Sequence, residues 1–152
     1  MAIWNKLKHF ERWENWGEPD RVNGLLLLLL DKITEEVKNY AWRKYKTITP
    51  CIIHCAYATD GHSDGSQHYK GSAADFHFEN ISAYEVYTVI QKVLEDNQVE
   101  NHVGFGVYPD WKKPGFHLDV RGWKARWSHV VGRYVGINKG VQIIKQEVEN
   151  VS

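Results

Sequence analysis

The order of its apolar segments constrains the fold of this chain more than any other feature. Residues 25–45 begin with six leucines and continue with charged residues on one side, which predicts a long helix. A short apolar run at 51–58 predicts a buried strand, and the Gly-, Asp- and Ser-rich segment 59–71 predicts a loop. Residues 72–79 then return to an extended pattern.

The later segments complete the pattern. Ser82 and Glu85 form a capping-box pair, and the apolar residues behind them follow helical spacing: Val86, Val89, Ile90, Val93 and Leu94. Residues 102–108 and 115–121 predict two strands joined by a turn, and 141–150 predicts a short C-terminal helix. We therefore expect an α+β fold, with a small, mostly antiparallel sheet and flanking helices.

Length and charge exclude several classes of protein. The 152 residues fit one domain, 1–152. Basic and acidic residues balance at 19 each, which argues against a nucleic-acid partner, because covering phosphates needs an excess of basic charge. The leucine run is far shorter than the ~20 apolar residues that span a bilayer, so no membrane insertion is expected. The first residues also lack the features of a secretory signal.

Two cysteines lie in the first apolar run. If this run is an extended strand, Cys51 and Cys55 point to the same face with Cα atoms about 13 Å apart at ~3.3 Å rise per residue. A disulfide needs Cα atoms within about 7 Å. We therefore expect two buried free thiols.

Three residues have the chemistry of a catalytic zinc site. His68 ends the polar loop, Asp75 starts the next strand, and His117 lies in a distant strand. Catalytic zinc sites use three ligands of this type and leave the fourth position for water. Gly71 lets the chain turn tightly between the first two ligands. One His and one Asp at this spacing occur often by chance, so the wider pattern carries the argument.

That wider pattern has two parts. The first, S-x-H-x-x-G-x-A-x-D, is matched by Ser66, His68, Gly71, Ala73 and Asp75. The second is a later apolar strand with the pattern H-x-D-x-R, matched by His117, Asp119 and Arg121 after Phe116. Across roughly residues 25–127 the chain resembles the zinc D-alanyl-D-alanine carboxypeptidase family, in particular its phage-lysin-like branch.

The resemblance implies a fold, a cofactor and a substrate. The fold is the small α+β arrangement shared with the Hedgehog signalling domain. The cofactor is Zn²⁺, bound by His68, Asp75 and His117. The partner is a peptidoglycan peptide, because the family hydrolyses peptide bonds in D-amino-acid-containing stem peptides, as a carboxypeptidase or as an endopeptidase of the endolysin type. Without a secretory signal, a phage or prophage setting is expected, with delivery to the cell wall by another component.

Zinc lowers the pKa of its bound water to about 7, but a further group must accept the water's proton. Asp119 is the first candidate for this catalytic role, because its side chain leaves the same strand face as His117. Asp119 could instead accept a hydrogen bond that fixes the tautomer of a ligand histidine. In a third arrangement, suggested by relatives with H-x-H here, Asp119 is itself a ligand and His117 assists it.

The chain departs from the family at two positions. Several members have an acidic residue three positions before the last ligand, where this chain has Pro114. Many have an arginine that holds the substrate carbonyl, in a stretch that here reads Ala-Tyr-Ala at 56–58. Arg121 or Arg126 could replace it. These departures leave open a second hypothesis, a non-catalytic zinc-containing module that binds the cell wall or belongs to a phage structure.

Other side chains are candidates for the surroundings of the site. We expect Ser66, Arg121 and Trp111 to contact the substrate, Trp111 because its turn immediately precedes the His117 strand. His77 shares a strand face with Asp75, so it is an alternative ligand, although a packed or hydrogen-bonded histidine is the favoured interpretation. His62 lies in the loop, where it could line the cleft.

Overall fold

The computed structural model describes residues 3–151, which contain three α-helices, three short 3-10 helices and six strands. In chain order these are η1 (Trp4–Lys6), η2 (Pro19–Arg21), α1 (Gly24–Tyr45), β1 (Cys51–Cys55), η3 (Gln67–Lys70), β2 (Ala73–Phe78), α2 (Ala83–Asp96), β3 (Gly104–Tyr108), β4 (Gly115–Asp119), β5 (Ala125–Val130), β6 (Arg133–Val135) and α3 (Ile137–Val151).

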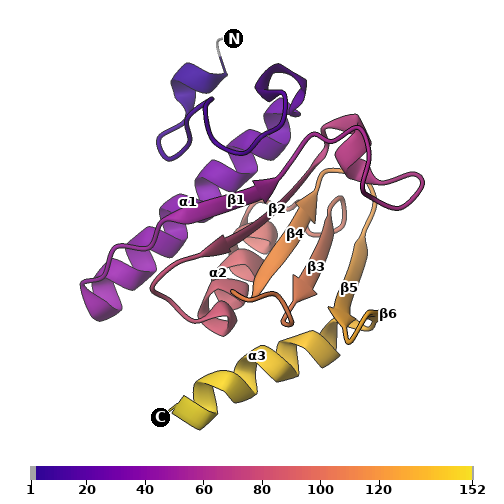
Figure 1. Ribbon diagram of the computed structural model, residues 1–152. Helices are drawn as coiled ribbons and strands as arrows, with labels where there is room; N and C mark the ends of the chain where they lie inside the picture. Colours follow the sequence, from indigo (N-terminus) through magenta and orange to yellow (C-terminus); the bar gives the residue numbers. More distant parts are fainter. Residues whose placement is uncertain (1–2, 152) are drawn as a thin grey trace.

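The strands form one sheet in the order β1-β2-β4-β3-β5-β6. Neighbouring strands are antiparallel, except for β3 and β5, which are parallel. Figure 1 shows α1 and α2 behind this sheet, while α3 runs along the end where β5 and β6 lie. The expectation of an α+β fold with a mostly antiparallel sheet and flanking helices is confirmed.

The helices cover one face of the sheet and leave the other face for polar groups. Alternate residues of the central strands point towards the helices, and the rings of Phe76, Phe105 and Phe116 pack together there. Helix α3 lies against the same face, because Gly140 approaches Ser128 and Val107 closely. Residues between these core positions point to the opposite face, where water and ligands have access.

Local signals explain where the helices begin. Asn23 caps α1, since its side chain accepts hydrogen bonds from the backbone N–H groups of Leu25 and Leu26. The Ser82 side chain accepts a hydrogen bond from the N–H of Glu85 and its hydroxyl donates to the Glu85 carboxylate, so the predicted pairing of these two residues at the start of α2 is confirmed. Within residues 3–151, none of the helices combines the length and the apolar character that crossing a membrane requires.

Two strands were not predicted from the sequence. β5 and β6 carry polar residues on both faces and lack an apolar run, so their pattern does not indicate strands. β5 is held by parallel pairing with β3 and by the packing of α3, for example through the Ser128 hydroxyl, which donates to the carbonyl of Ile137. Such tertiary contacts leave no periodicity in the sequence.

The N-terminal segment supports the loop that precedes β2. Trp4, Phe10 and Trp16 are buried, and their rings meet edge to face. The N–H of Tyr57 donates to the carbonyl of Trp16, which joins this segment to the chain just after β1. The first turn of the polar loop is therefore fixed by residues far earlier in the sequence.

A bulge in β1 corrects the prediction for the cysteines. Ile53 pairs with Phe76, but Cys55 pairs with Asp75, so the register shifts between them. Both thiols are free, as expected. However, only Cys51 is buried in the core, whereas half-buried Cys55 shares the polar face with Asp75. The prediction of a common face was wrong because an inserted residue inverts the alternation of the strand.

Gly71 tests how tightly the polar loop is fixed. Its φ is +70°, and a Cβ atom would lie 1.9 Å from the carbonyl oxygen of Arg21. We expect Gly71→Ala to lower the free energy of unfolding by about 3 kcal/mol, from left-handed strain plus a backbone clash. Gly61→Ala is the control, since Gly61 has φ +84° but nothing nearby, and should cost about 1 kcal/mol. Equal losses in chemical denaturation would contradict this packing.

Candidate metal centre

The polar face of the sheet carries a row of paired residues. Asp75 of β2 pairs with His117 of β4, which pairs with Gly106 of β3, which pairs with Trp127 of β5. Paired residues project to the same face, so Asp75, His117 and Trp127 lie side by side. Gly106 leaves room for the indole of Trp127, because a Cβ there would lie 2.5 Å from Trp127 Nε1.

His68 reaches this row from the polar loop. It lies in η3, where the Ser66 hydroxyl accepts a hydrogen bond from the His68 N–H, and Gly71 ends the turn with a positive φ. His68 Nδ1 lies 2.7 Å from the carbonyl oxygen of Ala56, so Nδ1 carries the proton and donates it. The other ring nitrogen, Nε2, is thereby directed at Asp75.

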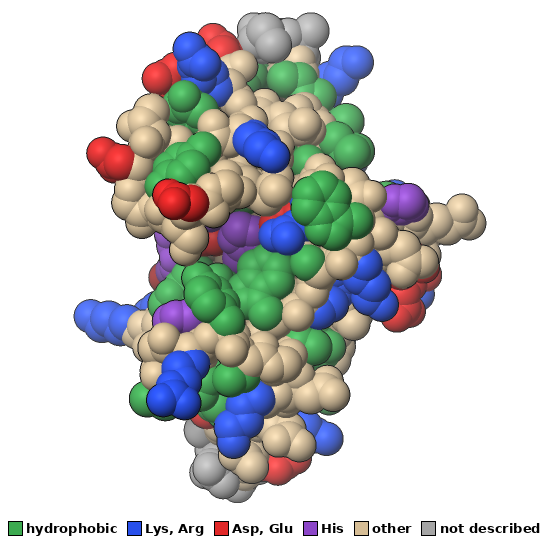
Figure 2. Space-filling view, turned by 90° about the vertical axis from the view of Figure 1, so that its right-hand side faces the viewer, with side chains coloured by type: hydrophobic (Ala, Val, Ile, Leu, Met, Phe, Trp, Pro, Cys, Tyr) green, Lys and Arg blue, Asp and Glu red, His purple; other side chains and the backbone are tan. Residues whose placement is uncertain are grey.

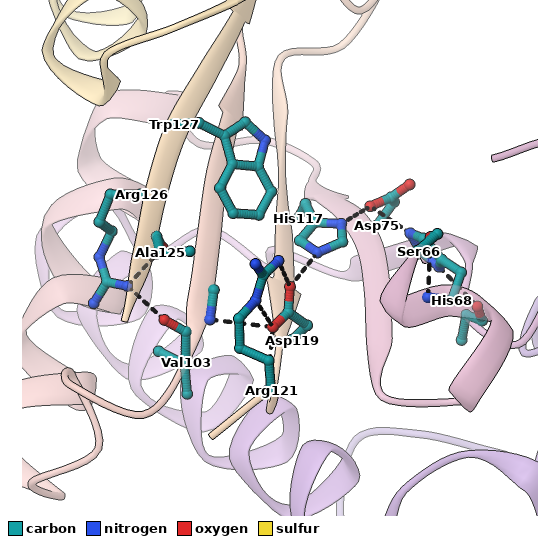
Figure 3. A network of polar contacts seen from close by, with 12 residues as sticks. Ser66, His68, Asp75, Val103, His117, Asp119, Arg121, Ala125, Arg126 and Trp127 are labelled. Atoms are coloured by element: carbon teal, nitrogen blue, oxygen red, sulfur yellow. Dashed lines mark hydrogen bonds and ion pairs between the residues drawn. The ribbon is translucent and has the colours of Figure 1, made fainter. Parts of the chain in front are cut away.

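The distances among these side chains fit one metal ion. Asp75 Oδ1 lies 3.3 Å from His68 Nε2 and 2.9 Å from His117 Nδ1 (Figure 3). Bonds of about 2.0–2.2 Å to a tetrahedral ion place neighbouring ligand atoms roughly 3.3–3.6 Å apart, so the hydrogen-bonded Asp75 and His117 atoms would separate by about half an ångström on binding it. The chain therefore brings together the three predicted ligands, His68, Asp75 and His117, in a partly buried group that could hold a metal ion.

The second nitrogen of His117 faces Asp119. Nε2 lies 2.7 Å from Asp119 Oδ2, on the other side of the ring from Asp75 (Figure 3). Asp119 is fully buried and also accepts hydrogen bonds from Arg121 Nε at 2.8 Å and Nη2 at 2.7 Å. Gly104, which pairs with Asp119, leaves the space for this carboxylate.

This geometry favours one of the three roles considered for Asp119. Its carboxylate is separated from the metal group by the His117 ring, and both oxygens are engaged by neighbouring donors. Such a carboxylate orients a ligand histidine and fixes its tautomer. The arrangement does not give Asp119 the access to bound water that a proton acceptor needs.

Hydrogen bonds between the carboxylate of Asp75 and the two histidines favour the charged form of each of these residues. Burial opposes ionisation of Asp75, but the hydrogen bonds from His117 and His68 outweigh it and hold its pKa well below the usual range. Burial also lowers the pKa of His68, yet the hydrogen bonds to Asp75 and Cys55 raise it to about 10. The pKa of His117 is raised by Asp119 and Asp75 against the effect of burial. A metal ion would displace protons from both histidines.

The group opens into a cleft of about 440 Å³ between the polar loop and the end of the sheet. In Figure 2 the surface is hollowed where histidine side chains lie beside a basic side chain and several hydrophobic ones. The cleft is lined by His62, Ser63, Asp64, Gly65, Ser66, Gln67, His68, Asp75, Tyr108, His117, Arg121, Trp127 and Tyr134.

The predicted substrate contacts separate into two groups. Ser66 and Arg121 line the cleft, whereas Trp111 does not. The Trp111 ring lies 4.5 Å from that of Tyr108 and 4.8 Å from that of His54, so it packs between them. It supports the wall of the cleft from outside.

Sequence reasoning missed Tyr108 as a cleft residue. Its hydroxyl accepts a hydrogen bond from Trp127 Nε1 at 3.0 Å, and burial raises its pKa to about 12. The phenol therefore stays protonated at neutral pH. Its position at the end of β3, one residue before the turn, gave no signal of this role.

The remaining histidines near the site have structural partners. His77 Nδ1 lies 2.6 Å from His54 Nε2, and His77 Nε2 lies 3.1 Å from Glu79 Oε1. The interpretation of His77 as a hydrogen-bonded residue is confirmed. His62 lines the cleft, as anticipated, and its ring stacks on that of His68 at 4.2 Å.

Comparison with known proteins adds no relative. No protein-family model matches the chain, and a search of curated proteins finds no match either. The argument for function therefore rests on the residues of the cleft.

Asp119 gives a test of how His117 is oriented. In Asp119→Asn the carboxylate charge is lost, and one of the donors around it must give up its acceptor. We expect the affinity for Zn²⁺, measured by calorimetry, to fall about 10- to 100-fold, as for other partners of metal-bound histidines. Asp96→Asn, which changes an exposed ion pair with Lys92, is the control. Unchanged affinity in a folded Asp119→Asn protein would refute the orienting role.

Proposed function

We propose that this protein is a zinc-dependent peptidase that hydrolyses a peptide bond in the stem peptides of peptidoglycan. The observation that carries the proposal is the convergence of His68, Asp75 and His117 at the wall of an open cleft. Three ligands of the His and Asp type, with one side left for water or substrate, are typical of catalytic rather than structural zinc.

The choice of substrate rests on the resemblance to the zinc D-alanyl-D-alanine carboxypeptidases. The residues that carry this resemblance are those that the fold gathers: Ser66 caps the turn that holds His68, Gly71 ends it, and Asp119 with Arg121 supports His117. The position of these motif residues around the proposed metal group supports the proposal.

Each cleft residue has a role in this proposal. Zinc held by the three ligands would polarise the scissile carbonyl and acidify a water molecule. Tyr108 offers a neutral phenol to the cleft, suited to hydrogen-bond the carbonyl oxygen as negative charge develops. Arg121 donates hydrogen bonds from Nε and Nη2 to Asp119. Its role is therefore to hold the carboxylate that orients His117, and not to bind the substrate carbonyl as the arginine of many relatives does.

The proton acceptor must come from a part of the cleft other than Asp119. Pro114 occupies the position of the acidic residue found in several relatives, and Asp119 is enclosed. On the loop wall, His62 and Asp64 line the cleft and have the chemistry to accept a proton. We assign the acceptor to this wall.

The same observation favours a second candidate function. A zinc group with Asp119 enclosed, and with Pro114 in place of the acidic residue of several relatives, also fits a module that binds a wall peptide without cleaving it. In that case the zinc would coordinate a substrate carbonyl or carboxylate, and the cleft would provide affinity alone. Hydrolysis distinguishes the two functions.

Digestion of purified peptidoglycan tests the proposal. We expect the zinc-loaded protein to release soluble peptides, with a product mass that identifies the bond. Chelation, His68→Ala and His117→Ala should each reduce the release by at least about 10³-fold, since each removes the Lewis acid or a ligand to it.

The matched control is His102→Ala, because His102 is exposed and does not line the cleft. It should retain both zinc and hydrolysis. Stoichiometric zinc with binding to peptidoglycan, but without any released fragment, would replace the peptidase by the binding module. Absence of zinc binding by the folded protein would remove both.

A further inference from the structure

A second group of metal-binding atoms lies behind the first, on the loop side of His68. It comprises Cys55, His62 and His68, each of which offers one ligand atom within 4.8 Å of those of the other two. Neither Cys55 nor His62 belongs to the pattern that predicted the first group. The second group therefore needs an explanation of its own.

The bulge in β1 is what brings Cys55 to this position. A regular strand would place its thiol on the core face, opposite Ala74. The shifted register instead pairs Cys55 with Asp75, so the thiol lies on the polar face next to the loop. It is half-buried, in contrast to the fully desolvated thiol of Cys51, whose pKa burial raises strongly.

His62 is held in place by Tyr69. The Tyr69 hydroxyl accepts a hydrogen bond from the His62 N–H at 2.9 Å and donates one to the His62 carbonyl at 2.6 Å. The His62 ring stacks on His68 with 19° between the ring planes. These two hydrogen bonds fix the backbone of His62 within the polar loop, so its side chain is held beside His68.

The distances match those of a thiolate–imidazole metal complex. Cys55 Sγ lies 3.6 Å from His62 Nε2 and 3.9 Å from His68 Nδ1. With Zn–S bonds of about 2.3 Å and Zn–N bonds of about 2.0–2.1 Å, tetrahedral geometry separates sulfur and nitrogen by roughly 3.5 Å. The two Sγ–N distances are close to this value, and turning the His62 ring out of its stack on His68 would direct both nitrogen lone pairs at one ion.

We propose that Cys55, His62 and His68 Nδ1 form a second cation site that takes a thiophilic metal ion such as Zn²⁺, Co²⁺ or Cd²⁺. The site shares His68 with the first group through the opposite ring nitrogen. A cation there releases two protons to solvent, one from the Cys55 thiol and one from His68 Nδ1, which now donates to the Ala56 carbonyl. When both groups are filled, His68 is a bridging imidazolate, so the second cation binds more weakly than the ion of the first group.

The site has a consequence for the cleft. A cation on Cys55 and His62 occupies the loop wall, and it engages His68 from behind. Excess thiophilic metal would therefore alter the first group through their common ligand. The inference does not depend on peptide hydrolysis, because it concerns ligands alone.

Cobalt spectroscopy tests the second site directly. Co²⁺ added to His117→Ala, which lacks one ligand of the first group, should produce the near-ultraviolet charge-transfer band of a cobalt–thiolate bond. In the unmodified protein the same band should grow with Co²⁺ added beyond the first equivalent. The double variant His117→Ala/Cys55→Ser should show no band, and His117→Ala/His62→Ala should show it only at a much higher cobalt concentration.

Cys51→Ala is the matched control, since it removes the other thiol of the same strand and should leave the band unchanged. A band that persists in Cys55→Ser, or no band in either His117→Ala or the unmodified protein, overturns the inference. These outcomes are independent of peptidoglycan cleavage, so failure of the peptidase proposal would leave a positive cobalt result standing.

Discussion

The antiparallel register between β2 and β4 is the constraint on which the candidate site depends. It pairs Asp75 with His117, which places two of the expected metal ligands side by side. It also pairs Ala73 with Asp119, so a small side chain lies beside the carboxylate that orients His117. A slip of one residue would turn Asp75 towards the helices and bury it without a partner. The next pair of this ladder, Phe76 and Phe116, resists that slip because both rings fill the core on the opposite face.

The glycines of β3 complete this arrangement from the other side of β4. Gly104 and Gly106 pair with Asp119 and His117. Any side chain at these glycines would collide with the Asp119–Arg121 ion pair or with Trp127. The strand therefore gives up side-chain packing on its polar face so that bulky functional groups from β4 and β5 can lie across it.

Much of this could be predicted from the sequence, because the signals were local. The capping box of α2, the polar loop and the alternation around Asp75 and His117 follow from neighbouring residues, and the structure confirms that the three expected ligands converge. The role of Asp119 needed the side-chain geometry, since two residues on one strand face can be a ligand, a proton acceptor or a support. Trp111 was misplaced because nearness in sequence to His117 does not fix the direction of a turn side chain.

Other features depend on contacts between distant segments and left no pattern to read. β5 forms on β3 although its own sequence is polar. Buried Trp16 accepts a hydrogen bond from the N–H of Tyr57, some forty residues later in the chain, and so holds the start of the polar loop. The bulge that turns Cys55 to the polar face is a property of the β1–β2 pair. The second metal group follows from that bulge, so it could not be anticipated.

Anomalous X-ray diffraction at the zinc absorption edge, from crystals of the zinc-loaded protein, tests the central claim most directly. The account predicts a strong peak at bonding distance, about 2.0–2.2 Å, from His68 Nε2, an oxygen of Asp75 and His117 Nδ1, with water on the cleft side. No peak within bonding distance of these three residues, or the three side chains turned away from one another in the presence of ample zinc, would contradict it.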